Sequence, residues 1–488
     1  MDKFTHMPSK EEIKYKILAK KGVLKPKNGL KSKHTFIVYS TYGEIFDLAE
    51  RLQDEGNEVL MYIPDDDYKR IGDGIVDKTS EWYRCIGKGY IWVFDGCENG
   101  DLQDWLRSKG EIVFGGNKIA DDLENERQLN QKWFKEAGFY QPFSTNFKSI
   151  DEAISFVEKH ADQRWILKQN GNAPKSINHM GKFEGNEDML FHLKELKKGW
   201  NEQQYGKFDC DLMEVVEGME VAASAFFNGH DFLKNSDGKI VGYLNWEEKK
   251  EADGNLGETT GETGTTFFGC TEDNELFKDI LLKPKIIAKL KEINFRGVFD
   301  INCIQTEDGL VALEPTCRFG IPSTAYEFLE GMITPCSDVI RYCAEGLDEP
   351  IEIHEGFGQV LVITSKPYPV EVDLDEESTS LGEKLWIMDG DGQTLIEDFT
   401  PEQKKHIHLY NFEKTTDSDT GEICYKVITK SGYLLTVTGR DTKGEYGKDS
   451  ENDIEAIRKN LLHYTKNNIY ISGIKYRQDI GKRIEKYL

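Results

Sequence analysis

The chain has 488 residues, a formal net charge of −25 and nine cysteines. A chain of this length exceeds one ordinary core, so we expect several subdomains. The negative charge argues against nucleic-acid binding through the whole surface, although a local basic site can still take an anionic substrate. No apolar run approaches the roughly 18 residues of a membrane helix. The cysteines are scattered without a C-x-x-C pair, which excludes a zinc ribbon and favours a reducing, cytoplasmic location.

The N-terminal third alternates between strand and helix patterns. Residues 1–33 are rich in lysine and are expected to form a basic lead-in, solvated or used as a partner-binding arm. Strands are then predicted at 34–40, 59–63, 90–94 and 112–114, with helices over 46–52 and 102–108. This order is typical of a doubly wound parallel sheet.

The turn at residues 40–44 follows the first predicted strand, where such sheets face their ligands, so it is a candidate to line a site. Gly43 is its one glycine, so the G-x-G-x-x-G fingerprint is absent. A dinucleotide-dependent oxidoreductase is therefore poorly supported.

The middle of the chain holds candidate nucleotide contacts. A helix is predicted over 121–137. The strand at 165–168 ends in Lys168, before a polar segment that reaches Met180. A lysine in this place suits a phosphate clamp beneath a closing loop, with an ordinary surface lysine as the alternative.

Residues 211–227 are predicted to form a hairpin that turns at Gly218. Its apolar connector can present backbone groups to an adenine, and Glu220 could take the ribose hydroxyls. Residues 247–269, rich in Gly and Thr, are predicted to be a long loop, either disordered or suited to close backbone approach to a polar ligand.

A helix over 275–293, kinked or restarted at Pro284, leads to a second predicted hairpin. Its strands, 298–305 and 310–314, carry Asp300 and Glu314, and Arg318 follows. Two carboxylates on adjacent strands with an arginine behind them suit Mg²⁺ that bridges nucleotide phosphates. The alternative is an exposed hairpin with ordinary surface carboxylates. Beyond Pro350 we expect short strands and an amphipathic helix over 449–465.

Several motifs, taken in order, resemble those of the ATP-grasp superfamily and, within it, of phosphoribosylamine–glycine ligase. E-P-T-C-R-F-G-I-P at 314–322 is similar to that family's E-F-N-C-R-F-G-D-P. L-L-T-V-T-G at 434–439 resembles its V-L-T-V-T-G strand, and Y-R-Q-D-I-G at 476–481 resembles its Y-R-x-D-I-G. V-F-G-G-N-K at 113–118 is similar to its V-F-G-P-S-K.

The resemblance implies a multidomain α/β and α+β fold. The expected parts are a lead-in, a Rossmann-like pre-ATP-grasp domain, an ATP-grasp domain of two α+β subdomains with a lid at about 145–210, and a C-terminal α+β domain: 1–33, 34–120, 121–349 and 350–488. It also implies a reaction in which ATP, with Mg²⁺ or Mn²⁺, phosphorylates a carboxylate and an amine attacks the acyl phosphate. The implied partners are a small carboxylate, such as glycine or another amino acid, and an amine. Neither nucleic acid nor membrane is expected, and the protein would be a monomer or homodimer.

The resemblance also assigns residues by position. The ATP-binding set is Arg127, Lys168, Lys175, Glu214, Val216 and Glu220. The metal set is Asp300, Glu314 and Thr316. Arg318 is the candidate catalytic residue. The candidate substrate loop contains Gly261, Thr263 and Gly264.

The substrate-facing parts depart from the family pattern. Thr316 replaces the family's asparagine, and Ser40-Thr-Tyr-Gly-Glu-Ile45 replaces S-G-G-R-E-H. The lid reads A-P-K-S-I where the family has A-G-K-G-V. We therefore expect an ATP-dependent ligase that joins either the family's substrates or a different amino acid and amine. A nucleotide-binding regulatory relative with little catalysis is the alternative.

Overall fold

A computed structural model describes residues 34–169, 177–307, 309–369, 375–418, 420–440 and 454–484. The basic lead-in and Lys175 lie outside these ranges. Within them, no helix combines the length and hydropathy needed to cross a bilayer.

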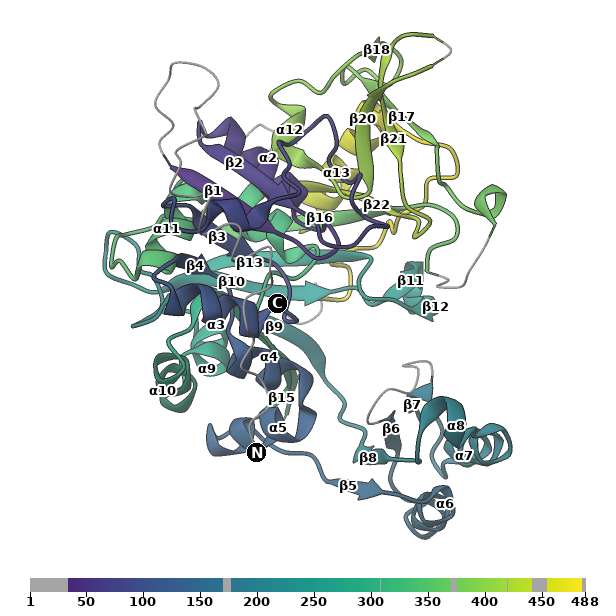
Figure 1. The fold of residues 1–488 in the computed structure, drawn as a ribbon. Coiled ribbons are helices and arrows are strands. Elements are labelled where there is room, and N and C mark those ends of the chain that lie inside the picture. The colour runs from purple at the N-terminus through teal and green to yellow at the C-terminus, as the bar shows by residue number, and fades with distance from the viewer. Residues whose placement is uncertain are drawn as a thin grey trace. The chain divides into compact units, whose positions relative to one another are not determined.

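The N-terminal sheet is parallel, as predicted (Figure 1). Its strands are β1 (Thr35–Tyr39), β2 (Glu58–Tyr62), β3 (Ile91–Phe94) and β4 (Ile112–Phe114), in the order β2-β1-β3-β4. The connecting helices are α2 (Phe46–Asp54) and α3 (Gly100–Ser108). Strands β1 and β3 are buried along nearly their whole length, which explains their continuous apolar sequences.

The chain divides into two compact units. The first contains residues 1–130, 221–302 and 314–488, and the second contains residues 131–220 and 303–313. The parallel sheet belongs to the first unit.

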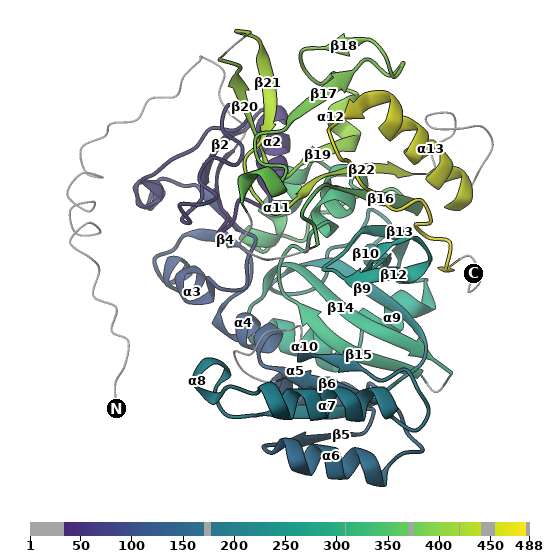
Figure 2. The ribbon, with the colours of Figure 1, turned by 90° about the vertical axis from the view of Figure 1, so that its right-hand side faces the viewer.

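An eight-stranded sheet, β15-β14-β9-β10-β13-β16-β22-β19, lies mainly in the first unit, except that residues 303–313 of β14 and β15 belong to the second. Its strands are β9 (Met219–Asn228), β10 (Val241–Glu247), β13 (Gly264–Thr271), β14 (Arg296–Thr306), β15 (Gly309–Thr316), β16 (Gly356–Thr364), β19 (Ile407–Leu409) and β22 (Tyr433–Arg440). Strand β16 pairs antiparallel with β13 and with β22, so the sheet continues beyond Pro350. Helix α13 (Ile454–Asn468) packs against β16 and β22 (Figure 2).

The remaining strands of the first unit form a smaller sheet and a hairpin. The order β18-β17-β21-β20, with β23 also pairing β17, uses β17 (Lys384–Met388), β18 (Leu395–Ile396), β20 (Phe412–Thr416), β21 (Ile423–Val427) and β23 (Ile469–Tyr470). The hairpin joins β11 (Lys250–Ala252) to β12 (Leu256–Thr259). The helices are α4 (Lys118–Asn125), α9 (Glu275–Leu281), α10 (Pro284–Glu292), α11 (Cys336–Glu345), α12 (Gln403–His406) and the π-helical turn η5 (Ala325–Glu330), with short 3₁₀ turns η2 (Trp82–Cys85), η4 (Asp253–Asn255) and η6 (Glu376–Ser378).

The second unit is a small α+β fold with its own core. Its sheet, β5-β8-β6-β7, uses β5 (Ser144–Phe147), β6 (Trp165–Gln169), β7 (His179–Met180) and β8 (Cys210–Glu214). Helices α6 (Ile150–Lys159), α7 (Glu187–Gly199) and α8 (Glu202–Tyr205) accompany it, while α5 (Arg127–Glu136) begins in the first unit. Buried Trp165, Leu167, Met189, Leu193 and Leu212 form the centre of that core.

Three local predictions were wrong. The hairpin over 211–227 does not form, because β8 and β9 belong to different sheets and residues 215–218 only connect them. The long loop over 247–269 is largely β11, β12 and β13: β11 pairs with β12, and β13 pairs with β10 and β16. The single helix over 121–137 is two helices, interrupted at Glu126, whose backbone is extended. The restart at Pro284 and the two strands over 296–316 are confirmed.

A buried ion pair joins η5 to the C-terminal strands. The Glu330 carboxylate lies 2.8 Å from His406 Nδ1 and accepts a 2.8 Å hydrogen bond from Thr438, and Arg440 lies 3.3 Å away. Burial raises the pKa of Glu330, but these partners outweigh burial and hold it below its usual range. The Glu330 carboxylate therefore binds a proton less tightly in the folded state than in the unfolded state.

The Glu330 ion pair predicts a measurable loss of stability at acid pH. The stabilisation is present above about pH 4.3, the ordinary glutamate value, and is lost as the pH falls through the lower folded value. Glu330→Gln should cost about 2 kcal/mol at neutral pH and flatten the loss of stability below about pH 4. Urea unfolding as a function of pH measures both effects. If Glu330→Gln lost stability below about pH 4 as steeply as wild type does, Glu330 would not be the group responsible.

Candidate active site

The candidate site begins at the carboxyl ends of β1 and β3. These strands are neighbours, and the chain runs outward from them to β2 on one side and β4 on the other. In parallel α/β sheets, ligands usually bind at the carboxyl ends of the strands, where the strand order reverses in this way. Ser40 follows β1, Asp95 follows β3, and the Ser40 hydroxyl donates a hydrogen bond to the Asp95 carboxylate. Burial, with Glu44 nearby, raises the pKa of Asp95 to about 7.

Arg318 brings a cation to these acids. Glu124 on α4 positions it through a 2.9 Å ion pair from Oε1 to the Arg318 Nε, while Oε2 accepts a 2.9 Å hydrogen bond from the Cys317 amide. Burial lowers the pKa of Arg318, but Glu124, Cys97 and Glu44 raise it further than burial lowers it. Arg318 is thus a permanently charged, rigidly held group. We define the switch-point cluster as Ser40, Glu44, Asp95, Glu124 and Arg318.

The Glu44 side chain is exposed to solvent, yet the neighbouring protein partly desolvates its carboxylate, which raises its pKa. Arg318 lowers this pKa, and Glu98 raises it. The predicted turn therefore does place polar groups beside Arg318.

Two buried acids, one on the eight-stranded sheet and one on η5, influence each other electrostatically. Asp300 on β14 is 9% exposed; its Oδ2 accepts a 3.4 Å hydrogen bond from Asn245, and its Oδ1 has no partner. Glu327 on η5 is 1% exposed, and its Oε2 also has no hydrogen-bond partner. Burial raises the pKa of Asp300, with Glu327 and Glu247 adding to the shift, and burial raises the pKa of Glu327 to about 8.

These donors fit a hard divalent cation. The buried Asp300 carboxylate has one oxygen, Oδ1, without a hydrogen-bond partner among the described residues. The Glu314 carboxylate on β15 is exposed, and Thr316 is half-buried. Among the described residues, no three His, Cys, Asp or Glu side chains form a cluster that would hold a metal alone. Such a donor set suits an ion that completes its shell with nucleotide phosphates.

The second unit carries four of the predicted ATP-binding residues. Lys168 is the penultimate residue of β6, which runs one residue further than predicted, and it is in register with Asp211 of β8. The Glu214 carboxylate is engaged by the Gln163 amide at 2.7 Å. Val216 is half-buried in the segment that connects β8 to β9. Glu220, half-buried, lies on β9.

The other predicted residues lie in the first unit. Arg127 is the first residue of α5 and is half-buried. Gly261 is exposed, whereas the Thr263 hydroxyl donates to the Glu248 and Lys250 carbonyls at 2.8 Å each. Gly264 is buried as the first residue of β13. Thr263 therefore holds the base of the predicted substrate loop.

Sequence reasoning missed Glu124, Asp95 and Glu327. Only one signal was present for Glu327: an acid within the apolar run Ala-Tyr-Glu-Phe-Leu. No local pattern distinguishes Glu124 from the neighbouring acids of α4, because its role depends on Arg318, 194 residues away.

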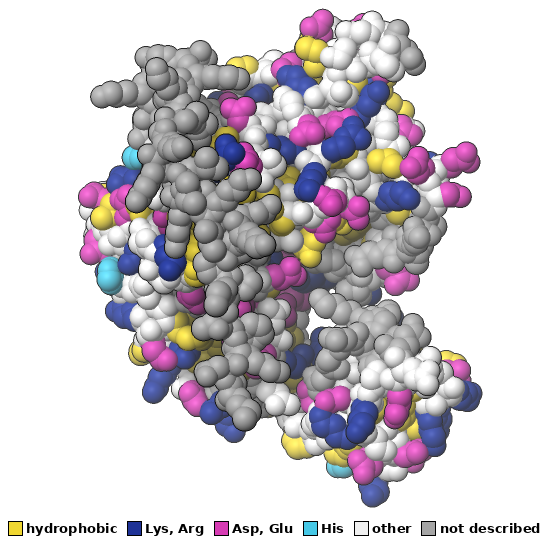
Figure 3. All heavy atoms as spheres, viewed as in Figure 1, with side chains coloured by type: hydrophobic (Ala, Val, Ile, Leu, Met, Phe, Trp, Pro, Cys, Tyr) yellow, Lys and Arg dark blue, Asp and Glu magenta, His cyan; other side chains and the backbone are white. Residues whose placement is uncertain are grey.

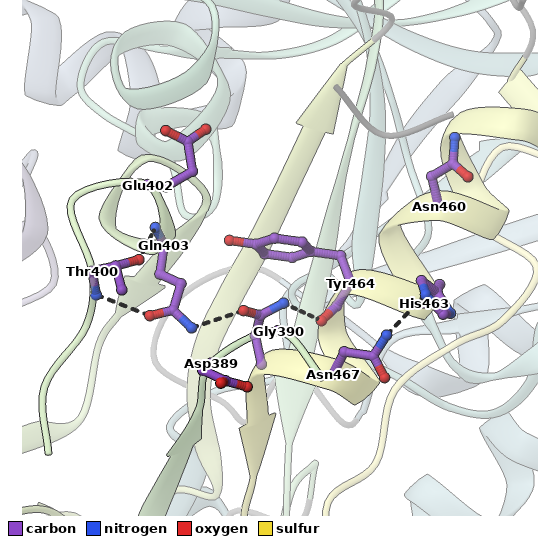
Figure 4. A pocket seen from close by; sticks show the side chains of 10 residues that line it. Asp389, Gly390, Thr400, Glu402, Gln403, Asn460, His463, Tyr464 and Asn467 are labelled. Atoms are coloured by element: carbon purple, nitrogen blue, oxygen red, sulfur yellow. Dashed lines mark hydrogen bonds between the residues drawn. The ribbon is translucent and has the colours of Figure 1, made fainter. Parts of the chain in front are cut away.

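A cavity of about 340 Å³ lies elsewhere on the first unit, between α12 and α13 (Figure 4). Its polar walls bind each other: the Gln403 amide donates to Asn468 at 2.7 Å, and Asn467 contacts His463 at 2.8 Å. Among the side chains coloured in Figure 3, acidic and basic groups are mixed. The self-paired walls of the cavity make it a weaker candidate site than the switch-point cluster.

Comparison with solved structures gives the class: the chain has the ATP-grasp fold. Phosphoribosylamine–glycine ligase from Thermotoga maritima matches with a TM-score of 0.62 and 18% identity, covering 92% of this chain and all of that one. The biotin carboxylase domain of Hydrogenobacter thermophilus 2-oxoglutarate carboxylase, in complex with MgADP, matches with a TM-score of 0.57 and 12% identity over 90% of this chain and 91% of that one. The predicted α/β and α+β multidomain class is confirmed.

Within that class, the chain resembles phosphoribosylamine–glycine ligase, as predicted. The Nostoc enzyme is 23% identical over 78% of this chain and 81% of its own length. The Lactococcus lactis enzyme is 22% identical over 82% and 84% respectively. No family model matches the chain.

Proposed function

We propose that the protein is an ATP-dependent carbon–nitrogen ligase that joins a carboxylate to an amine through an acyl phosphate. The observation that carries the proposal is Arg318, fixed by Glu124 at the point where the parallel sheet reverses its strand order. The resemblance to phosphoribosylamine–glycine ligases supports the reaction class.

The proposed reaction has two balanced steps. A substrate carboxylate oxygen attacks the γ-phosphorus of ATP, the bond to ADP breaks, and ADP leaves with its electron pair. The amine nitrogen then attacks the acyl carbon, the bond to phosphate breaks, and the nitrogen loses a proton. Splitting the condensation in this way turns the carboxylate oxygen into a good leaving group.

Residues of the chain would supply positioning and charge. Arg318 would hold the reacting carboxylate or phosphate, and Asp95, with a pKa of about 7, is suited to accept the amine proton. Asp300 and Glu314, with Thr316, would hold Mg²⁺, which neutralises phosphate charge when bound. Arg127, Lys168 and Lys175 would contact phosphates, Glu214 to Val216 the adenine, and Glu220 the ribose. Loop residues Gly261 and Gly264 would contact substrate.

We also propose the four-part division 1–33, 34–120, 121–349 and 350–488, a lid at about 145–210, and a cytoplasmic monomer or homodimer. Mn²⁺ would substitute for Mg²⁺. A regulatory nucleotide-binding relative is the second candidate, because Thr316 replaces the family's asparagine and the lid reads A-P-K-S-I in place of A-G-K-G-V.

One assay separates these functions. The purified protein is incubated with ATP, Mg²⁺ and a panel of amino acids, with and without phosphoribosylamine generated in situ, and ADP and product mass are followed. A ligase releases ADP only when both a carboxylate and an amine are present. Thermal stabilisation by nucleotide without any turnover would instead identify the regulatory relative.

Glu124→Gln tests how Arg318 is positioned. The amide keeps an acceptor for the Cys317 backbone but loses the charge that orients the guanidinium, so kcat should fall about 10- to 100-fold, as for other supporting residues of active sites. Asp122→Asn, on the same helix and paired with Lys118 at its surface, is the matched control. Equal kcat values for both variants would remove Glu124 from the site.

A further inference from the structure

One face of strand β14 carries two polar side chains in succession. Asp300 and Asn302 are separated by a single residue within this strand, which runs unbroken from Arg296 to Thr306. Alternate residues of a strand project from the same face, and their Cα atoms lie roughly 6.5 Å apart. Ile301 between them is completely buried and belongs to the opposite face. Asp300 and Asn302 therefore stand side by side on one face of the eight-stranded sheet.

Asn245 identifies this face and holds one oxygen of Asp300. It lies on β10 opposite Ala222 of β9, and β9 separates β10 from β14 in the sheet. The Asn245 Nδ2 donates a 3.4 Å hydrogen bond to Asp300 Oδ2, a reach that the small Ala222 side chain permits. The same Nδ2 donates to the Tyr326 hydroxyl at 3.0 Å. Asp300 Oδ2 is thus engaged, whereas Oδ1 has no partner among the described residues.

Asn302 is buried to the same extent as Asp300. The exposed fraction is 8% for Asn302 and 9% for Asp300. Within the described part of the chain, the Asn302 side-chain amide makes no hydrogen bond. A carboxamide that is nine-tenths buried almost always has a partner, because leaving it unpaired is costly. The unpartnered amide therefore requires an explanation, as does the unpartnered Asp300 oxygen beside it.

The two side chains together suit a hard cation. The free Asp300 oxygen belongs to a carboxylate, and Asn302 adds a neutral amide oxygen on the same face. Carboxylate and amide oxygens are the ligands that Mg²⁺ and Mn²⁺ prefer. An anion placed here would instead be repelled by the carboxylate. The neighbouring strand β15 offers Thr316, a hydroxyl, where the resemblance to the ligase family leads one to expect an amide oxygen.

We propose that Asn302 is a further ligand of the divalent cation, binding it through the amide oxygen beside Asp300 Oδ1. This inference rests on the proposed ligase function and adds a residue to its metal set. Asn245 is a positioning residue, because it engages Asp300 Oδ2 and leaves Oδ1 for the ion. Asn302 would supply from β14 the neutral amide oxygen that is missing at Thr316.

Manganese binding tests this ligand apart from turnover. Free Mn²⁺ is measured by electron paramagnetic resonance with the full-length protein and ADP. Asn302→Ala removes the amide oxygen and should raise the Kd for Mn²⁺ at least about tenfold. Asn302→Asp keeps an oxygen in this place and should stay within about threefold of wild type. Equal Kd values for wild type and Asn302→Ala would overturn the proposal.

Gln305→Ala is the matched control. Gln305 is an exposed amide on the same strand and, three residues after Asn302, projects from the opposite face. Its loss should leave the Kd for Mn²⁺ unchanged. A loss of affinity equal to that of Asn302→Ala would contradict a site on the Asp300 face.

Thermal unfolding separates a metal ligand from a residue that only packs. The rise in the thermal midpoint on adding Mn²⁺ and ADP is compared within each variant, so a change in the stability of the protein itself cancels. Wild type and Asn302→Asp should show the full rise, and Asn302→Ala a smaller one, because weaker binding stabilises less. A lower midpoint of Asn302→Ala without metal, combined with a full rise, would make Asn302 a structural residue.

Turnover separates this proposal from the proposed function. Asn302→Ala should need at least about tenfold more Mg²⁺ for half-maximal ADP release, with kcat largely recovered at saturating Mg²⁺. Wild-type turnover with the same Mg²⁺ dependence in Asn302→Ala overturns the role of Asn302 while the ligase function stands. A wild type that binds no Mn²⁺ with ADP and releases no ADP with any carboxylate and amine overturns both.

Discussion

Asp300→Asn is expected to reduce amine-dependent ADP release by about 10³-fold or more, which corresponds to roughly 4 kcal/mol in the barrier. The variant should nevertheless unfold at a temperature no lower than wild type. The two effects have one cause: the Asp300 carboxylate is buried with Oδ1 unpartnered, beside buried Glu327. An amide of the same shape removes the burial of a carboxylate, but it is a poor ligand for Mg²⁺.

ADP release under saturating ATP and Mg²⁺, together with a thermal scan of the protein without nucleotide, measures both effects. Glu307→Gln, an exposed acid at the turn of the same hairpin, is the matched control and should change neither quantity. Glu314→Gln should lose activity as Asp300→Asn does, without a gain in stability, because Glu314 is already exposed. Full activity in Asp300→Asn would remove the metal assignment, and a large loss of stability would make Asp300 a structural residue.

The parts of the fold that could be predicted depend on local patterns. The β1-α2-β2 unit is set by an apolar strand, a helix period and Gly56, all within 22 residues. The β14–β15 strands are set by two apolar runs around a polar turn. Where pairing is decided by distant residues, local patterns failed: β8 and β9 adjoin in sequence but pair with strands of different sheets.

The candidate site divides in the same way. The motif at 314–322 identified Arg318, because motif residues are contiguous. Its partner Glu124 and the facing acids Glu44 and Asp95 come from three other segments, and only their position at neighbouring strand ends unites them.

Arg477→Met is expected to destabilise the protein by about 3–5 kcal/mol, the typical cost of removing one partner from a buried ion pair. Arg477, within the tail motif Y-R-Q-D-I-G, is 1% exposed. Its guanidinium bonds Asp479 at 2.8 and 2.9 Å and the Lys250 carbonyl at 3.0 Å, and it lies 3.4 Å from Glu248. The tail therefore fixes the β11–β12 hairpin beside the predicted substrate loop, which gives the motif a structural reason.

Arg483→Met is the matched control, because Arg483 also binds Glu248, at 3.1 Å, but its side chain is 42% exposed. Solvent screens this second pair, so the control should cost no more than about 1 kcal/mol. Thermal midpoints compare the variants directly, since 3 kcal/mol or more corresponds to a shift of roughly 4 °C or more in a unit as large as the first. Losing Arg477 leaves the buried Glu248 with one exposed partner, so the difference between the variants measures burial rather than charge. Equal midpoints would show that the tail does not hold the hairpin.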